Sequence, residues 1–216
     1  MILYATPLSS YSLKVRLAFA LKGLGVELSE PPGGYRSADY KALVPSATIP
    51  ALVDGDFVLA ESDTILEYLE DRFPASPLLP SDAKGRARAR FLGRLHDLHL
   101  EPLVRKLFSL SAASEQRDAI QAKLDLVERN LDADGPFAIG LAPSLADCAY
   151  PATFAILDAL APVFGWQFVW GPRTARWRQA LARHPAIDGL VQPYRDIVAG
   201  WLASKRESIF KSGGIT

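Results

Sequence analysis

Residues 49–63 read Ile-Pro-Ala-Leu-Val-Asp-Gly-Asp-Phe-Val-Leu-Ala-Glu-Ser-Asp. Two β-forming runs, 49–53 and 56–59, flank Asp54-Gly55, the dipeptide that best fits a type I′ hairpin turn. The apolar residues that follow recur at helical spacing over 62–72. This stretch therefore predicts a β-hairpin that leads almost directly into a helix.

Upstream of the hairpin, short β-like runs alternate with helical ones. The sequence predicts a strand at 2–5, a helix at 12–24, a strand at 26–29 and a short helix at 36–43. With the hairpin and its helix, the order is βαβαββα. The first part of the chain is thus expected to form an α/β domain over residues 1–76.

The rest of the chain has nearly continuous helical periodicity. Three prolines, at 74, 77 and 80, remove backbone donors and disfavour the α region, so residues 77–82 are expected to form an extended linker. An all-helical domain is expected over 83–216, and a capping box is predicted at Ser144-Leu-Ala-Asp147. Its predicted helices are 82–110, bent or broken at Pro102, then 114–132, 144–163, 173–183 and 187–203.

Composition narrows the function classes. The 216 residues carry 24 basic and 24 acidic side chains, so no overall basic field exists to hold nucleic acid or an anionic membrane. A single cysteine excludes an intrachain disulfide and multi-cysteine metal sites, and the three histidines are too few for a typical metal site. No signal peptide or membrane span is apparent. We expect a cytoplasmic protein with no metal, nucleic-acid or membrane partner.

Two helix starts carry more polar groups than capping requires. Residues 9–12 place three serine hydroxyls and one tyrosine between the first strand and the first helix, where free N–H groups and the helix dipole favour an anion. Glu61-Ser62-Asp63 lies at another predicted helix N-terminus. On local grounds Ser62 is an ordinary N-cap, and the alternative is that it binds a ligand.

A basic stripe lies on the predicted 82–110 helix. Arg86, Arg90 and Arg94 share one face near the N-terminus, where cations oppose the helix dipole. The stripe is either a solvated face or a surface that meets Glu67 or Glu70 of a second subunit.

Several ordered motifs together resemble the glutathione transferase superfamily. They are Ser9-Ser-Tyr-Ser-Leu-Lys-Val-Arg16, Ile49-Pro-Ala-Leu-Val53, Glu61-Ser-Asp-Thr-Ile65 and the Ser144–Asp147 box. The set is specific in its order, whereas each motif alone is weak. The resemblance covers the whole chain and implies a thioredoxin-like N-terminal domain, an all-helical C-terminal domain and a homodimer.

The resemblance also implies roles for individual residues. Ser9 matches the catalytic serine of the zeta-like and tau-like classes, with Ser10 and Tyr11 as competitors for the contact with the glutathione sulfur. Pro50 matches the cis-proline that turns the Ile49 backbone towards the ligand. The implied glutathione-binding residues are Ser9, Thr48, Ile49, Pro50, Glu61 and Ser62, and the residues expected to face the electrophile are Leu8, Tyr11, Leu107 and Phe108.

The function implied is transfer of glutathione, as a co-substrate, to a small hydrophobic electrophile. A free thiol has a pKa of about 8.5, so the protein's task is to stabilise the nucleophilic thiolate, and a serine hydroxyl does so by donating a hydrogen bond. The alternatives are a non-catalytic binding module with this fold, and a glutathione-dependent isomerase or dehalogenase that shares the thiolate step.

Overall fold

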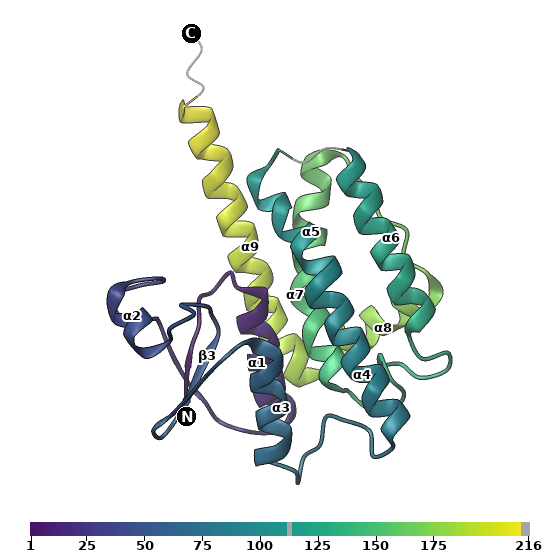
Figure 1. Cartoon of the computed structure of the whole chain (residues 1–216). Coiled ribbons are helices and arrows are strands. Elements are labelled where there is room, and N and C mark those ends of the chain that lie inside the picture. The colour runs from purple at the N-terminus through teal and green to yellow at the C-terminus, as the bar shows by residue number, and fades with distance from the viewer. Residues whose placement is uncertain (112–113, 213–216) are drawn as a thin grey trace.

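The N-terminal part of the chain is a four-stranded sheet with helices. The computed structural model describes residues 1–111 and 114–212. The strands lie in the order β2-β1-β3-β4, with β1 and β2 parallel and the other pairs antiparallel. This confirms the predicted βαβαββα order and the thioredoxin-like fold (Figure 1). The elements are β1 (Ile2–Tyr4), α1 (Ser10–Leu21), β2 (Glu27–Ser29), α2 (Ala38–Leu43), β3 (Ala51–Asp54), β4 (Phe57–Ala60) and α3 (Ser62–Arg72).

The hairpin forms where predicted, but its turn is shifted by one residue. Asp54 pairs with Phe57, so the two central residues of the turn are Gly55 and Asp56. Gly55 has φ 65°, and Asp56 is not among the residues with positive φ. A positive φ at the first central residue alone is the pattern of a type II′ turn, so the predicted type I′ turn is wrong.

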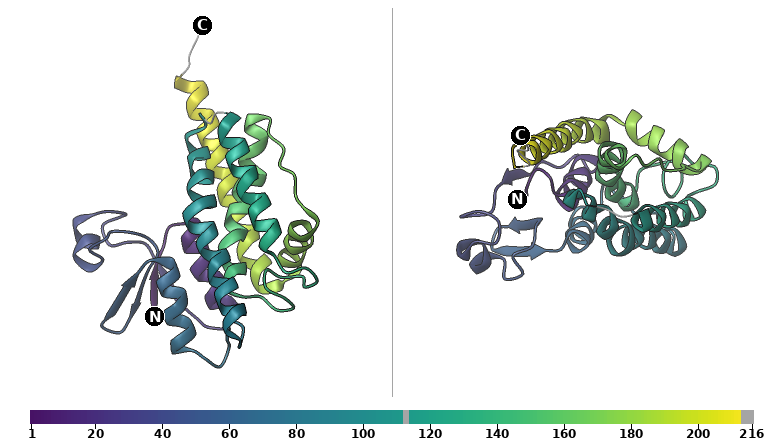
Figure 2. Two further views of the ribbon diagram at one scale, coloured as in Figure 1. Left: turned by 45° about the vertical axis from the view of Figure 1, so that its right-hand side comes forward. Right: turned by 90° about the horizontal axis from the view of Figure 1, so that it is seen from above.

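The C-terminal part is helical, and the predicted 82–110 helix is broken into four pieces. Two views in Figure 2 show these pieces running as one column beside α6 and α7. The other predicted helices are confirmed with shifted ends. The elements are α4 (Ala83–Leu95), η1 (His96–Leu100), α5 (Glu101–Arg105), η2 (Lys106–Ser109), α6 (Ser114–Asn130), α7 (Leu145–Leu160), η3 (Ala161–Phe164), α8 (Pro172–Arg183) and α9 (Pro185–Ser212).

The break in the column follows from Pro102. Proline has no N–H, so the Leu98 carbonyl loses its usual donor four residues on. The backbone responds with one wide π turn over His96–Leu100, in which the Glu101 N–H donates to the His96 carbonyl. Such turns often occur at functional sites. Here the turn carries His96 and Asp97 and leads directly to Glu101.

Helix α1 lies between the sheet and the helical part. It packs against α3 on one side and against α7 and α9 on the other (Figure 1). Its side chains are buried almost all round, as suits a helix packed on several sides. The first turn of α1 therefore lies where the two parts of the chain meet.

The proline-rich linker bends at residues 78–79 and 81–82 instead of running fully extended, and it is firmly anchored. Leu78 and Leu79 are buried, and their N–H groups donate to the Glu70 carboxylate, which also pairs with the buried Lys22 ammonium at 2.6 Å. Leu78 in turn accepts from the N–H of Leu145 at the start of α7. The segment therefore ties α1 and α3 to the helical part.

Candidate functional site

A cleft of about 760 Å³ lies between the sheet and the helical part. One side consists of the ends of β1 and β4, the first turns of α1 and α3, and the loops before α2 and β3. The other side consists of α4, η1 and α5. The lining residues are Thr6, Leu8, Ser9, Tyr11, Tyr35, Arg36, Thr48, Ile49, Glu61, Ser62, Asp63, Thr64, Arg94, Asp97, Leu98 and Arg105.

The three candidate hydroxyls in the first turn of α1 have different hydrogen-bond partners. Ser9 is the N-cap, and its Oγ accepts from the Ser12 N–H at 3.1 Å. Ser10 Oγ and the Tyr11 hydroxyl both donate to the Glu101 carboxylate, at 2.8 and 3.0 Å. Among the described residues nothing accepts the Ser9 proton. Ser9 and Tyr11 line the cleft and Ser10 does not, so of the three candidates Ser9 alone both lines the cleft and has an uncommitted proton.

The start of α3 presents an uncapped helix N-terminus to the cleft. Glu61 occupies the N-cap position with φ 69° and makes no capping side-chain bond. The Ser62 hydroxyl has no hydrogen-bond partner among the described residues, although the residue is only 6% exposed. The interpretation of Ser62 as an ordinary N-cap is therefore wrong. Its hydroxyl and the first N–H groups of α3 form a site suited to an anion.

The loop before β3 is fixed by two hydroxyls. The Ile49–Pro50 peptide bond is cis, as the resemblance implies. The Tyr40 hydroxyl donates to the Thr48 carbonyl at 2.7 Å, and Thr48 Oγ1 donates to Glu61 at 3.3 Å. Sequence reasoning did not find Tyr40, because its partner is defined only by the folded loop.

Beneath the start of α3 lies a charged cluster that sequence reasoning also missed. The Lys14 side chain is 1% exposed and pairs with Asp63 and, at 2.7 Å, with Asp97. His96 is fully buried between Asp97 and Thr153, at 2.7 Å from each. Burial opposes ionisation of Asp97, but His96 and Lys14 lower the pKa of its carboxyl to about 2. The sequence feature that could have revealed this buried cluster is a single lysine between the apolar residues Leu13 and Val15.

The wall opposite Ser9 differs from expectation. Leu8 and Tyr11 line the cleft, but Leu107 is fully buried in the core and Phe108 packs its ring on Trp201 at 4.6 Å. The short 3₁₀ segment after α5 turns both away. Their place is taken by Leu98 and by Arg105, whose side chain is 50% exposed. This wall is therefore more polar and more basic than predicted.

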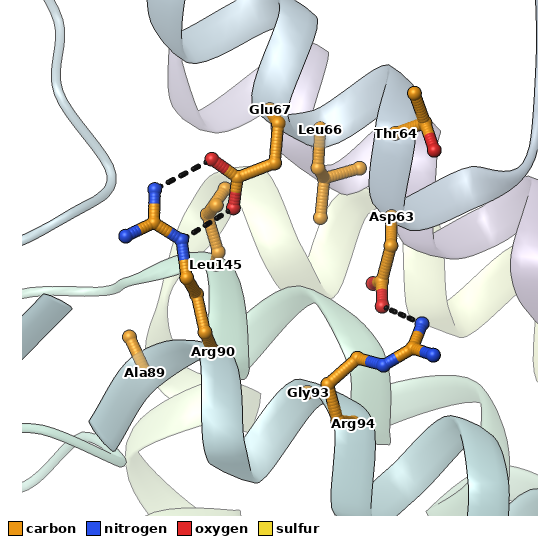
Figure 3. A pocket seen from close by; sticks show the side chains of 9 residues that line it. All are labelled: Asp63, Thr64, Leu66, Glu67, Ala89, Arg90, Gly93, Arg94 and Leu145. Carbon is orange, nitrogen blue, oxygen red and sulfur yellow. Dashed lines mark hydrogen bonds and ion pairs between the residues drawn. The ribbon is translucent and has the colours of Figure 1, made fainter. Parts of the chain in front are cut away.

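A second hollow, of about 300 Å³, lies between α3 and α4. Leu66, Leu145 and nearby backbone form its floor, and two ion pairs span it (Figure 3). Arg90 holds Glu67 bidentately at 2.6 and 2.8 Å, and Arg94 pairs with Asp63 at 2.8 Å. Arg90 and Arg94 thus have their acidic partners within the same chain, so the alternative in which they pair with Glu67 or Glu70 of a second subunit is wrong.

Within residues 1–111 and 114–212, no group of three His, Cys, Asp or Glu side chains is placed to hold a metal ion. Over the same residues, no helix combines the length and the apolarity that a bilayer span requires.

Comparison with known sequences gives the family. Residues 3–77 match the family model described as glutathione S-transferase, N-terminal domain. A maleylacetoacetate isomerase from Pseudomonas aeruginosa is 36% identical over 202 residues, covering 86% of this chain and 92% of that protein. A stringent starvation protein A homolog from Coxiella burnetii is 47% identical over 92 residues, covering 43% of this chain and 44% of that protein. The chain spans about half the length of several curated relatives that it matches.

Solved structures agree with the sequence matches. A maleylacetoacetate isomerase from Methylobacterium extorquens, with bound malonate and glutathione, superposes with a TM-score of 0.74 at 28% identity, covering 90% of this chain and 97% of that one. The fold, the N-terminal family model and the full-length relative therefore agree, and the chain belongs to the glutathione S-transferase family.

Proposed function

We propose that this chain is a glutathione transferase that binds glutathione in the 760 Å³ cleft and activates its thiol as a thiolate. The observation that carries the proposal is the hydroxyl of Ser9, which lines the cleft, is 7% exposed and has no acceptor for its proton among the described residues. A sulfur anion is a suitable acceptor for it.

The cleft offers complementary groups to each end of glutathione. Ser62 and the open N-terminus of α3 suit the carboxylate of the γ-glutamyl end, and the Glu61 carboxylate suits its ammonium group. The backbone of Ile49, preceding Pro50, pairs strand-like with the cysteinyl part. Arg36 lines the same cleft and supplies a cation for the glycyl carboxylate. These placements put the sulfur towards Ser9.

The reaction follows from thiol chemistry. The serine hydroxyl is no base at neutral pH, so the thiol proton leaves to solvent and Ser9 donates a hydrogen bond to the remaining thiolate. The thiolate then attacks the electrophile, forming a carbon–sulfur bond and releasing the leaving group, or adding to a double bond. A hydrogen bond to a charged group is worth about 1.5–3 kcal/mol, which corresponds to about one to two pKa units.

Ultraviolet titration of the thiolate in the bound state tests the proposal. Ser9→Ala is expected to raise the pKa of the bound thiol towards its free value and to slow conjugation, while glutathione affinity changes little. Ser10→Ala and Tyr11→Phe are the matched controls and are expected to leave the titration unchanged. If the wild-type protein binds glutathione without lowering the thiol pKa, the non-catalytic binding module is the better interpretation.

A second candidate is isomerisation of a carboxylate-bearing substrate. Arg105 favours it, because the guanidinium is half exposed in the wall that the second substrate faces, and its Nη1 has no partner among the described residues. Relatives named maleylacetoacetate isomerase and maleylpyruvate isomerase act on such compounds. Arg105→Met is then expected to raise the KM for maleylpyruvate about tenfold or more and to leave the KM for an uncharged aryl halide unchanged, whereas a loss of kcat through the uncompensated Glu101 carboxylate should affect both substrates equally.

We also propose that the chain forms a homodimer through α3 and α4. Phe91 on α4 and Leu98 on η1 are 48% and 54% exposed, and both border a groove that α4 and η1 form with α6 and that shares Arg94 with the hollow of Figure 3. Large apolar side chains exposed side by side typically mark an interaction surface.

A further inference from the structure

One buried carboxylate organises the first turn of α1. Glu101 begins α5, directly after the π turn, and its side chain is 3% exposed. It accepts hydrogen bonds from Ser10 Oγ at 2.8 Å and from the Tyr11 hydroxyl at 3.0 Å. Arg105 donates to both oxygens, with Nε at 3.3 Å from Oε2 and Nη2 on Oε1. Among the described residues, the donors around this carboxylate therefore belong to Ser10, Tyr11 and Arg105.

Glu101 therefore binds the hydroxyl protons of Ser10 and Tyr11 and leaves that of Ser9 available in the cleft. Tyr11 lines the cleft beside Ser9, so its phenol is the nearest competitor for a ligand's sulfur. Burial, with the negative charges of Glu101 and Asp97, raises the pKa of Tyr11, so the phenol stays protonated. Both acceptors of its hydroxyl nevertheless lie away from a ligand: Glu101 Oε2 at 3.0 Å and the Asp97 carbonyl at 3.3 Å.

Arg105 makes this arrangement compatible with a thiolate. An unpaired carboxylate beside the cleft would disfavour a second negative charge there. The Arg105 guanidinium neutralises Glu101, and it also stacks over the Tyr11 ring at 5.4 Å from the ring centre. Glu101 can thus hold the two hydroxyls without a net negative charge at this wall.

We propose that Glu101 is a positioning residue that reserves the contact with the glutathione sulfur for Ser9, by binding the hydroxyl protons of Ser10 and Tyr11. This inference rests on the proposed thiolate function and deepens it. Loss of the carboxylate leaves the Tyr11 hydroxyl with only the longer 3.3 Å contact to the Asp97 carbonyl, so that it shares the sulfur contact.

The test is a double-mutant comparison of Ser9→Ala and Tyr11→Phe in the wild-type and Glu101→Gln backgrounds. The readout is the pKa of bound glutathione, measured from thiolate absorbance. In the wild-type background, Ser9→Ala is expected to raise that pKa by about one unit and Tyr11→Phe to leave it unchanged. In the Glu101→Gln background, Tyr11→Phe should raise it, and Ser9→Ala should raise it by less than half as much as before.

Two further measurements guard against an effect on folding alone. Glu101→Asp keeps the charge that Arg105 needs but shortens the reach to the hydroxyls, so it should reproduce the Glu101→Gln pattern. In the wild-type protein, the tyrosine ζ-carbon NMR signal that Tyr11→Phe removes should not move when glutathione is added.

The outcomes separate the two proposals. Tyr11→Phe effects that are equal in both backgrounds, or a Tyr11 signal that moves on glutathione binding, would overturn the role of Glu101 and leave the role of Ser9 standing. A wild-type protein that binds glutathione without lowering its thiol pKa would overturn both proposals.

Discussion

Lys14 Nζ lies 2.7 Å from Asp97 Oδ2, and this ion pair joins the sheet part of the chain to the helical part. Lys14 comes from α1 and Asp97 from the π turn that Pro102 imposes. The same ammonium pairs with Asp63 in the first turn of α3. One buried cation therefore fixes two cleft-lining carboxylates from different parts of the fold.

Replacing Lys14 by methionine is expected to lower the free energy of unfolding by about 3–5 kcal/mol, because it leaves buried carboxylate charge uncompensated. Urea denaturation followed by circular dichroism measures the change. Lys84→Met, at an exposed position of α4, is the control and should change stability by less than about 0.5 kcal/mol. Equal effects of the two substitutions would show that the ion pair contributes nothing net.

The pKa of Asp97 gives a pH dependence with a definite sign. Its pKa is about 2 in the folded protein, against 3.8 for an unperturbed aspartate side chain. A lowered pKa contributes stability that is fully present above about pH 4 and is lost as the pH falls towards 2. The contribution is about 2 kcal/mol at 1.36 kcal/mol per unit.

Asp97→Asn should therefore flatten the pH dependence of stability between pH 4 and 2, measured by urea unfolding at several pH values. Asp118→Asn, on an exposed carboxylate of α6 whose side chain is 75% exposed, should leave the slope unchanged. Parallel curves for wild type and Asp97→Asn would contradict the lowered pKa.

The sequence predicts those features that depend on neighbours along the chain. The hairpin at 51–60, the βαβαββα order and the Ser144–Asp147 box all follow from local patterns, and the structure confirms them. The Glu101 cluster does not follow, because Ser10 and Glu101 lie 91 positions apart and meet only in the folded chain. The prediction that Leu107 and Phe108 face the electrophile assumes one regular helix to residue 110. The break near Pro102 changes which residues of this segment face the cleft, so that prediction fails.

Removing the Asp147 carboxylate is expected to lower the free energy of unfolding more than removing any other single polar group in the helical part. It is fully buried and accepts from Ser144 N and Oγ, both at 2.8 Å, from Ala138 N at 3.0 Å and from Trp177 Nε1 at 2.6 Å. Asp147→Ala leaves these donors unpaired and should lower unfolding free energy by about 3 kcal/mol or more, whereas Ser144→Ala should cost about 1 kcal/mol. Chemical denaturation measures both, and similar losses would refute the central role of the carboxylate.

Ser62→Ala separates ligand binding from helix capping. Since the Ser62 hydroxyl makes no bond in the described part of the chain, its removal should leave the melting temperature unchanged. If the hydroxyl binds the carboxylate of glutathione, affinity should fall about ten- to a hundredfold by calorimetry. Ser144→Ala is the matched serine control, with the opposite pattern of lower stability and unchanged affinity. Unchanged affinity in Ser62→Ala would remove this residue from the proposed site.

Phe91→Asp tests the proposed homodimer. Wild-type protein is expected to show twice the 23.5 kDa mass of one chain in light scattering. Because Arg90 and Arg94 are already paired within the chain, the dimer should depend on apolar contact and persist in high salt. A charge at position 91 should therefore shift the mass towards the monomer. Leu141→Asp is the control, since Leu141 is 86% exposed and lies outside α3 and α4. A wild-type monomer at micromolar concentration, or dissociation by salt alone, would contradict this apolar interface.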